Sequence, residues 1–175
     1  RASQPFILPL LIVSCVWASH AAALTTQEQL GKSLFFDQNL SINHNQSCAS
    51  CHSPSAGWTG ADAVINSLGA VYEGSIAGRF GNRKPPSAAY ATQAPILYRA
   101  TSGAFVGGTF WDGRATGERL GIPTAEQALG PFLNPLEQAL DSAGDVIGSV
   151  CISSYAVTFL EVCGADACLT ENVSR

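Results

Sequence analysis

Two cysteines and a histidine lie close together at positions 48, 51 and 52, in the run Cys48-Ala49-Ser50-Cys51-His52. Two thiols one helical turn apart can reach the two vinyl groups of one porphyrin, and the adjacent imidazole can then point at the iron. A thioredoxin-like pair would be expected near a βαβ pattern, which the sequence does not show, and a zinc site needs two further ligands at finger-like spacing. We therefore predict one covalently bound haem c, attached through Cys48 and Cys51 with His52 as the iron ligand.

What occupies the sixth coordination position of the iron can be predicted by counting the other Met and His residues of the chain. Electron-transfer cytochromes usually close that position with Met or a second His, but this sequence has no Met and three His. We expect His20 to be lost with a leader segment and His44 to be a solvated loop residue. The iron is therefore predicted to be open, water-bound or held by a weaker oxygen donor, and an open iron binds small ligands such as peroxide. This favours a catalyst or sensor over an electron carrier.

The first 23 residues have the pattern of a signal peptide. Arg1 precedes the apolar run of residues 5–16, and small residues at 18–23 follow it. The run is shorter than the roughly 20 residues of a transmembrane helix, so we predict no transmembrane segment and cleavage after Ala23. A lipoprotein anchored through Cys15 ranks second, because it leaves the alanines unexplained. The protein is thus expected to be exported, to a periplasm or cell surface, where disulfides and covalent haem both form. Because the chain starts at Arg1 and lacks Met, we expect it to be a fragment.

Composition limits the rest of the chain to one domain, residues 24–175. The 175 residues are 46% apolar and 13% charged, with a formal net charge of -4. A nucleic-acid partner is not expected, since phosphate binding needs clustered Lys and Arg. The bases that do cluster lie in residues 78–119, where they either form ordinary solvated surface or face an anion such as the haem propionates.

The hydrophobic pattern predicts a mainly α fold with long Gly/Pro-rich loops. Helical spacing occurs from Thr25 or Thr26 to Asp37, and a short helical turn is expected around the cysteines. Further helices are expected at residues 124–129, 134–140 and 152–162. The sequence has no sustained alternation of apolar and polar residues with period 2, so no sheet is predicted.

Three cysteines remain for disulfides. If residues 152–162 form a helix, Cys151 and Cys163 lie about 18 Å apart at 1.5 Å per residue, which is too far for a bridge. Cys163 with Cys168 is the easiest local closure, and Cys151 with Cys168 needs the tail to fold back. Both pairings stay open from sequence.

Several motifs in order give the chain a family resemblance between about Leu24 and Cys168. They are Leu30-Gly31-Lys32-Ser33-Leu34-Phe35-Phe36-Asp37, Leu40-Ser41, Ser47 to His52, Phe110-Trp111-Asp112-Gly113-Arg114-Ala115, Glu126-Gln127-Ala128-Leu129-Gly130-Pro131 and Asn134-Pro135. The sequence resembles bacterial di-haem cytochrome c peroxidases and the related MauG proteins. The resemblance implies two cytochrome c-like domains, each with one haem. The N-terminal haem would reduce hydrogen peroxide, with electrons that the second haem takes from a small cytochrome or cupredoxin. A homodimer is among the assemblies expected.

The resemblance also implies roles for single residues. Cys48 and Cys51 would form the thioethers, and His52 would be the proximal ligand. Asn82 would be a calcium ligand between the two domains. Apart from the resemblance, Trp111 is expected as a large aromatic residue to pack in the core at the haem edge.

This sequence departs from the family pattern in three places: at the residue before Phe110, in the lengthened stretch of residues 116–125 before Glu126, and in the second CxxCH, which it does not contain. Thr109 stands where the family has a Gln, directly before Phe110. Glu126 is the nearest candidate for the acid/base that moves a proton between the peroxide oxygens, although a helix-surface acid is the other interpretation. Arg114 is either a catalytic residue or the partner of Asp112 in a structural ion pair. No second CxxCH follows within 175 residues, so the chain is either truncated before a second haem domain or a single-haem relative. The alternative function is thus a single-haem electron-transfer or ligand-binding cytochrome without peroxidase activity.

Overall fold

The computed structural model describes residues 23–169. The expected leader, apart from Ala23, and the lipid-anchor candidate Cys15 lie outside this range. Seven α-helices occur in the described part: α1 (Thr26–Phe36), α2 (Cys48–Cys51), α3 (Ala63–Ser67), α4 (Pro123–Ala128), α5 (Gly130–Leu133), α6 (Ala143–Cys151) and α7 (Ala156–Cys163). Three 3-10 turns, η1 (Gln38–Leu40), η2 (Pro54–Ala56) and η3 (Ala91–Gln93), and two strands, β1 (Tyr98–Arg99) and β2 (Phe105–Val106), complete it. The fold is helix-rich with little sheet, as predicted.

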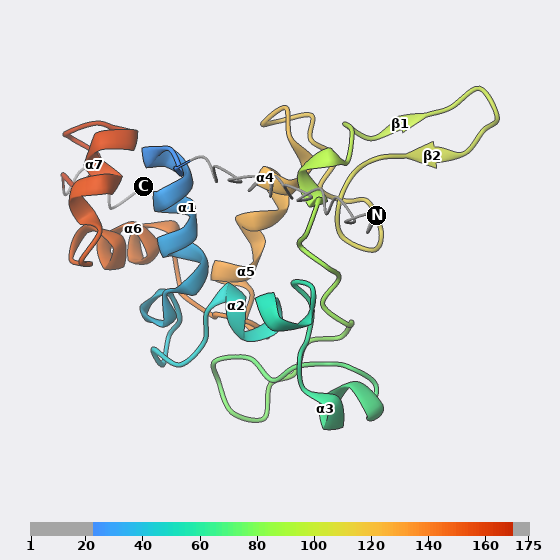
Figure 1. Cartoon of the computed structure of the whole chain (residues 1–175), viewed down its shortest axis with the longest axis horizontal. Helices are drawn as coiled ribbons and strands as arrows, with labels where there is room; N and C mark the ends of the chain where they lie inside the picture. Colours follow the sequence, from blue (N-terminus) through green and yellow to red (C-terminus); the bar gives the residue numbers. More distant parts are fainter. Residues whose placement is uncertain (1–22, 170–175) are drawn as a thin grey trace, which may run out of the picture.

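Helices α1, α6 and α7 form one side of the molecule, with α1 against α7 and α6 against α7 (Figure 1). The first of these begins where the sequence indicates. The Thr25 hydroxyl accepts the Glu28 N–H at 3.3 Å, and the Glu28 carboxylate accepts the Thr25 N–H at 2.8 Å. This reciprocal capping box satisfies two donors that a helix N-terminus otherwise leaves unpaired. At the other end, the Tyr155 hydroxyl donates to Asp37 at 2.6 Å and joins the start of α7 to the end of α1.

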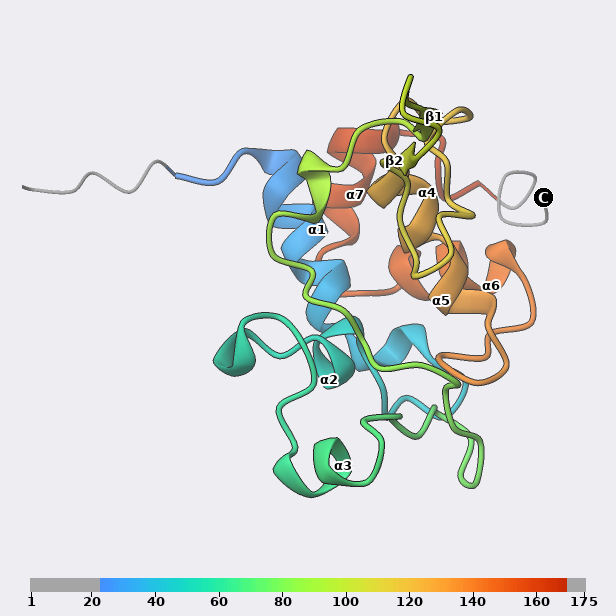
Figure 2. The same cartoon turned by 90° about the vertical axis from the view of Figure 1, so that its right-hand side faces the viewer.

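Helix α2 lies next to this group of helices, since it contacts α1. Seen from the side, α2 and α3 lie below the α1–α7 pair (Figure 2). The apolar side chains that are most deeply buried in the described residues include Leu30 on α1, Leu40 on η1 and Val150 on α6. The core therefore lies between the two terminal helical segments, and the cysteine helix is attached to its edge.

Two of the expected helices have different bounds. The expected helix 134–140 is wrong: α5 ends at Leu133, and residues 134–140 form turns. Pro135 disfavours helical geometry at Asn134, and the Asn134 side-chain oxygen accepts the Leu136 N–H at 3.0 Å. This local bond replaces the helical one.

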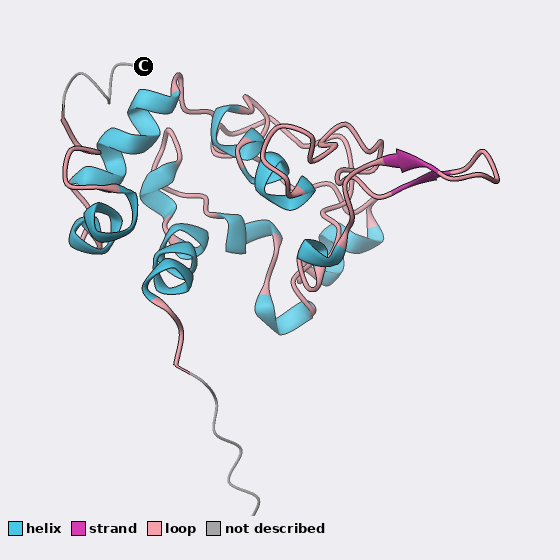
Figure 3. Ribbon diagram, turned by 90° about the horizontal axis from the view of Figure 1, so that it is seen from above, coloured by secondary structure: helices cyan, strands magenta, loops and turns pink. Residues whose placement is uncertain are grey.

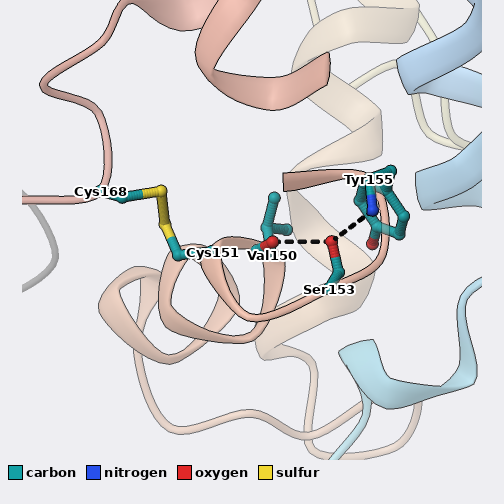
Figure 4. Close-up of a disulfide and its surroundings, with 5 residues drawn as sticks. All are labelled: Val150, Cys151, Ser153, Tyr155 and Cys168. Carbon is teal, nitrogen blue, oxygen red and sulfur yellow. Dashed lines mark hydrogen bonds between the residues drawn. A yellow bond between two sulfur atoms is a disulfide. The ribbon is translucent and has the colours of Figure 1, made fainter. Parts of the chain in front are cut away.

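The expected helix 152–162 starts late. The chain turns between α6 and α7, where Ser153 Oγ donates to the Val150 carbonyl at 2.7 Å and accepts the Tyr155 N–H at 3.3 Å (Figure 4). Helix α7 then begins at Ala156. The seryl hydroxyl provides the backbone partners that a continuous helix would have provided.

The turn between α6 and α7 determines which cysteines form the disulfide. Cys151 pairs with Cys168, with their Cα atoms 5.7 Å apart (Figure 4). Of the two pairings that the sequence leaves open, Cys151 with Cys168 is the one present, and Cys163 is an exposed free thiol. The tail folds back because α6 and α7 are bent by 119° relative to each other.

A small antiparallel hairpin was not expected. Strand β1 pairs with β2 in the register Tyr98 with Val106 and Arg99 with Phe105. Figure 3 shows it projecting from the side opposite α1, α6 and α7. Two residues per strand are too few to produce an alternating pattern, so the sequence carried no signal for it.

No single helix among residues 23–169 is both long enough and apolar enough to cross a membrane. Helices α6 and α7 together reach the required length and hydropathy, but only as a pair bent by 119°.

Candidate haem site

The two candidate attachment cysteines lie on α2, one turn apart. The turn is closed by the Ser50 N–H, which donates to the Ser47 carbonyl at 3.0 Å, and by the His52 N–H, which donates to the Cys48 carbonyl at 2.9 Å. The Ser50 hydroxyl accepts the Ser47 N–H at 3.0 Å. These bonds fix both thiols on one short helical turn, as the spacing predicts.

His52 follows directly and is oriented by a backbone group. Its Nδ1 lies 3.2 Å from the carbonyl oxygen of Trp58. A carbonyl only accepts, so Nδ1 is the donor in this contact, and Nε2 is the ring nitrogen left for an iron. The Trp58 carbonyl is held in turn by a tight loop, because the Trp58 N–H donates to the Ser53 carbonyl at 2.8 Å and the Ser53 N–H donates to the Thr59 carbonyl at 2.9 Å. Such a second partner is typical of metal-ligating histidines.

This donor set fits a covalently attached haem. Cys48 and Cys51 are both free thiols, and His52 directly follows them with its Nδ1 bonded to a backbone carbonyl. Burial raises the pKa of both thiols, that of Cys51 to about 11, and the charge of Glu137 adds to the effect. The rival zinc site is not supported within residues 23–169, since no group of three His, Cys, Asp or Glu side chains is placed to hold a metal ion. Two of the three downstream cysteines are already paired with each other.

Glu137 is a member of this neighbourhood that the sequence analysis did not identify. Its carboxyl accepts the Asn134 side-chain N–H at 2.8 Å. Burial raises its pKa, and the positive charge of Arg114 opposes that rise. The charge of Glu137 in turn raises the pKa of both Cys48 and Cys51. The Asn134-Pro135 dipeptide was the sequence signal that could have identified Glu137. A turn there brings Glu137, three residues after Asn134, back within hydrogen-bond distance of the Asn134 side chain.

Arg114 and Trp111 are both exposed but have fixed partners. The Arg114 guanidinium contacts Asp112 at 2.8 Å and lies 3.5 Å above the centre of the Phe110 ring. The ion pair with Asp112 that the sequence suggested is therefore present. Trp111 is 63% exposed, and its indole N–H donates to the Lys84 carbonyl at 2.9 Å. Its expected place at the haem edge stays a prediction.

Glu126 accepts hydrogen bonds from the loop before α4. Its carboxylate accepts the backbone N–H groups of Leu120, Gly117 and Arg119 at 2.9, 2.9 and 2.6 Å. These bonds lower its pKa, so the carboxylate is ionised at neutral pH and is a weaker proton acceptor than an ordinary Glu. Gly117 is needed for this loop, because its φ is +86° and a Cβ would fall 2.6 Å from Pro123.

Of the remaining candidates, Asn82 and His44 are exposed and Thr109 is half-buried. Asn82, the expected calcium ligand, is exposed in the loop after Gly81. His44 is exposed, and its Nδ1 lies 3.3 Å from the Asn39 carbonyl. Thr109, which replaces the family's Gln, donates its hydroxyl to the Pro123 carbonyl at 2.9 Å.

The comparisons with known proteins agree on one family. The family model described as di-haem cytochrome c peroxidase matches residues 25–175. The methylamine utilization protein MauG of Paracoccus denitrificans is 40% identical over 112 residues, which are 63% of this chain and 27% of that protein. Cytochrome c551 peroxidase of Pseudomonas aeruginosa is 39% identical over 111 residues, 63% of this chain and 25% of that protein.

A solved structure supports the same assignment. The diheme peroxidase BthA from Burkholderia thailandensis has a TM-score of 0.71 and 30% identity, over 83% of this chain and 34% of that one. The matched part thus spans between a quarter and about a third of the length of these three relatives. The helix-rich fold around the cysteine turn, the ordered motifs and the family match together lead to one conclusion: the chain belongs to the di-haem cytochrome c peroxidase family.

Proposed function

We propose that this chain binds one haem c through Cys48 and Cys51, with His52 as the axial ligand, and that it is the peroxide-reducing haem domain of an exported peroxidase. The observation that carries the proposal is the position of His52. Its ring is held by the Trp58 carbonyl at 3.2 Å, next to two free thiols on one turn. The bound haem would supply the iron at which hydrogen peroxide is reduced.

The chain's own residues would attach and orient the cofactor. Cys48 and Cys51 would form the thioethers, and the Trp58 carbonyl would keep the His52 ring turned so that Nε2 faces the iron. His44 points its Nδ1 toward the Asn39 carbonyl on the surface, which supports an open sixth position. The positive charge of Arg114 lowers the pKa of Glu137. Arg114 would therefore also attract an anionic group of the cofactor placed near Glu137.

The electrons would come from elsewhere. A second haem domain and a small donor, either a cytochrome or a cupredoxin, are the expected sources, as in the two-domain proteins that the chain resembles. Calcium at Asn82, export to a periplasm or cell surface and a homodimer belong to the same proposal.

The test uses the protein expressed from its whole reading frame, together with a haem-attachment system. We expect covalent haem on the peptide with Cys48 and Cys51, a high-spin iron signal, and peroxide consumption with a reduced donor. Six-coordinate low-spin iron in every redox state, with no turnover for any donor, would overturn the peroxidase proposal.

A second candidate function, a single-haem electron-transfer or ligand-binding cytochrome, is favoured by two observations. Thr109 stands in place of the family's Gln and is bonded to the Pro123 carbonyl. Glu126, the candidate acid/base, already accepts three backbone N–H groups. Haem attachment without peroxide turnover, with one haem in the whole gene product, would select this function.

A further inference from the structure

Gln46, two residues before Cys48, has a buried side chain that the functional proposal does not use. Its exposed fraction is 6%. The amide nitrogen donates to the Glu73 carbonyl at 2.9 Å and lies 3.9 Å from Cys51 Sγ, within range of a hydrogen bond to sulfur. Its Oε1 is buried without a partner among the described residues. A buried amide oxygen without a partner is costly, so a role for this side chain is to be expected.

The backbone around Gln46 is held on two sides. The Ser41 hydroxyl, which is fully buried, accepts the Gln46 N–H at 3.1 Å. The Asn45 side-chain N–H donates to the Ser75 carbonyl at 3.0 Å, and the Ser75 hydroxyl donates back to Asn45 at 2.6 Å. Because both neighbouring segments are fixed, the Gln46 amide reaches the cysteine turn from a rigid support.

The two cysteines differ in what contacts them. Burial raises the pKa of Cys48, and its own backbone N–H opposes the rise. The contact to Cys51 Sγ comes instead from the side chain of Gln46, on the segment before α2. The position of the Cys51 sulfur therefore depends on a residue outside the CxxCH motif.

We propose that Gln46 is a positioning residue for thioether formation at Cys51. This inference rests on the proposed attachment of haem to Cys48 and Cys51. In that reaction the thiol adds across a vinyl group: the C–S bond forms at the carbon next to the ring, and the thiol hydrogen moves to the terminal carbon. No oxidant or reductant is consumed. The Gln46 amide, fixed by Glu73, would hold Cys51 Sγ toward its vinyl group while Cys48 reacts independently.

The experiment compares Gln46→Glu and Gln46→Leu with the wild type, all as the full protein made with a haem-attachment system. Gln46→Glu keeps the size and loses the N–H donor, and Gln46→Leu loses all polarity. The haem peptide that spans Cys48 and Cys51 is isolated after proteolysis, and its absorption is measured in alkaline pyridine. A vinyl group that has not reacted stays conjugated and moves the α band to longer wavelength. We expect both variants to show this shift and to match a Cys51→Ser reference, which is attached through Cys48 alone.

Gln138→Leu is the matched control, because Gln138 is 2% exposed and both of its side-chain polar atoms lack a described partner. It should keep both thioethers. Two thioethers in both Gln46 variants would overturn the inference and leave the haem proposal intact. A wild type without covalent haem on this peptide would instead overturn the proposed function.

A second measurement applies if a Gln46 variant accumulates no haem protein. The full chain is made without haem attachment, with its disulfide intact, and the alkylation rates of Cys48 and Cys51 are compared by mass spectrometry. We expect Gln46→Glu to change the rate at Cys51 several-fold and to leave Cys48 unchanged. Equal changes at both thiols, or none, would contradict the proposal.

Discussion

At the scale of single residues, His52 depends on one backbone carbonyl for its orientation. We expect His52→Gly to keep haem on Cys48 and Cys51 but to lose the axial nitrogen ligand, because the thiols lie on a turn that the substitution does not remove. Added imidazole should restore the wild-type iron spectrum. His44→Gln is the control, since His44 is exposed and its Nδ1 lies against the Asn39 carbonyl, and its spectrum should match the wild type. An unchanged spectrum in His52→Gly would show that another residue binds the iron.

Glu126 should make a contribution to stability that depends on pH. Hydrogen bonds from Leu120, Gly117 and Arg119 lower its pKa below the ordinary value of 4.5. A carboxyl with a lowered folded-state pKa stabilises the fold above its unfolded pKa, and the contribution is lost as the pH falls through the folded value. We expect Glu126→Gln to lower the thermal midpoint at pH 7, and the difference from the wild type to shrink below about pH 4.5. Circular dichroism melts across pH 3 to 8 measure it, and a difference that does not vary with pH would contradict this account.

The ionised carboxylate of Glu137 should lower the stability of the fold, which is the opposite of the effect of Glu126. Burial raises its pKa, so ionising it costs stability in the folded state once the pH exceeds its unfolded pKa. Glu137→Gln keeps an oxygen that can accept the Asn134 N–H and removes the charge. We expect this variant, without haem, to melt higher than the wild type at pH 7 and to lose that advantage at pH 4. A lower midpoint at pH 7 would show that the ionised form is needed for the fold.

At the scale of elements, the turn between α6 and α7 is held by the disulfide of Cys151 with Cys168, which are 17 residues apart. Closing a loop of this size restricts the unfolded chain and contributes about 3 kcal/mol in the chain-entropy model. The double substitution of Cys151 and Cys168 by Ser should therefore lower the free energy of unfolding in urea by roughly that amount. Cys163→Ser, which removes the exposed free thiol, should have little effect. A larger loss for Cys163→Ser would indicate that Cys163 is the native partner.

The same elements show what sequence can predict. Helix α1 was predictable because its capping box needs only residues three apart, Thr25 and Glu28. The cysteine turn was predictable for the same reason: Cys48, Cys51 and His52 are local. The 134–140 segment failed because one Asn side chain competes with the helix for backbone donors. The disulfide could not be chosen because it depends on the 119° bend between α6 and α7.

The residues that reach the candidate haem site from distant segments of the chain could not be predicted from the sequence either. Gln46 meets Cys51 only because residues 41–46 are fixed against Glu73 and Ser75. Glu137 reaches the same neighbourhood because its carbonyl accepts the Ser75 N–H at 2.7 Å. Gly74 makes this approach feasible, since a Cβ there would clash with the Leu136 carbonyl. The motif identified the cofactor, and the fold supplies the residues around it.

At the scale of the whole molecule, few apolar side chains are fully buried within the polypeptide. Six hydrophobic residues in the described range are buried, whereas large ones such as Trp58, Phe80 and Trp111 are 36%, 51% and 63% exposed. Covering 100 Å² of apolar surface contributes about 2.5 kcal/mol. A haem attached at α2 would add an apolar macrocycle beside the helix that carries Cys48 and Cys51. The stability of this domain is therefore expected to depend strongly on the cofactor.

The last prediction follows from that dependence. Cys48→Ser together with Cys51→Ser removes covalent attachment while changing only two sulfur atoms. If apolar contact with the haem stabilises the fold, this variant should melt at a clearly lower temperature and over a broader range than the loaded wild type. Cys163→Ser is the matched control, because it also replaces a thiol but lies at the end of α7, and it should melt like the loaded wild type. Equal, sharp transitions in all three proteins would mean that the polypeptide core is sufficient by itself and that haem binds to a surface already formed.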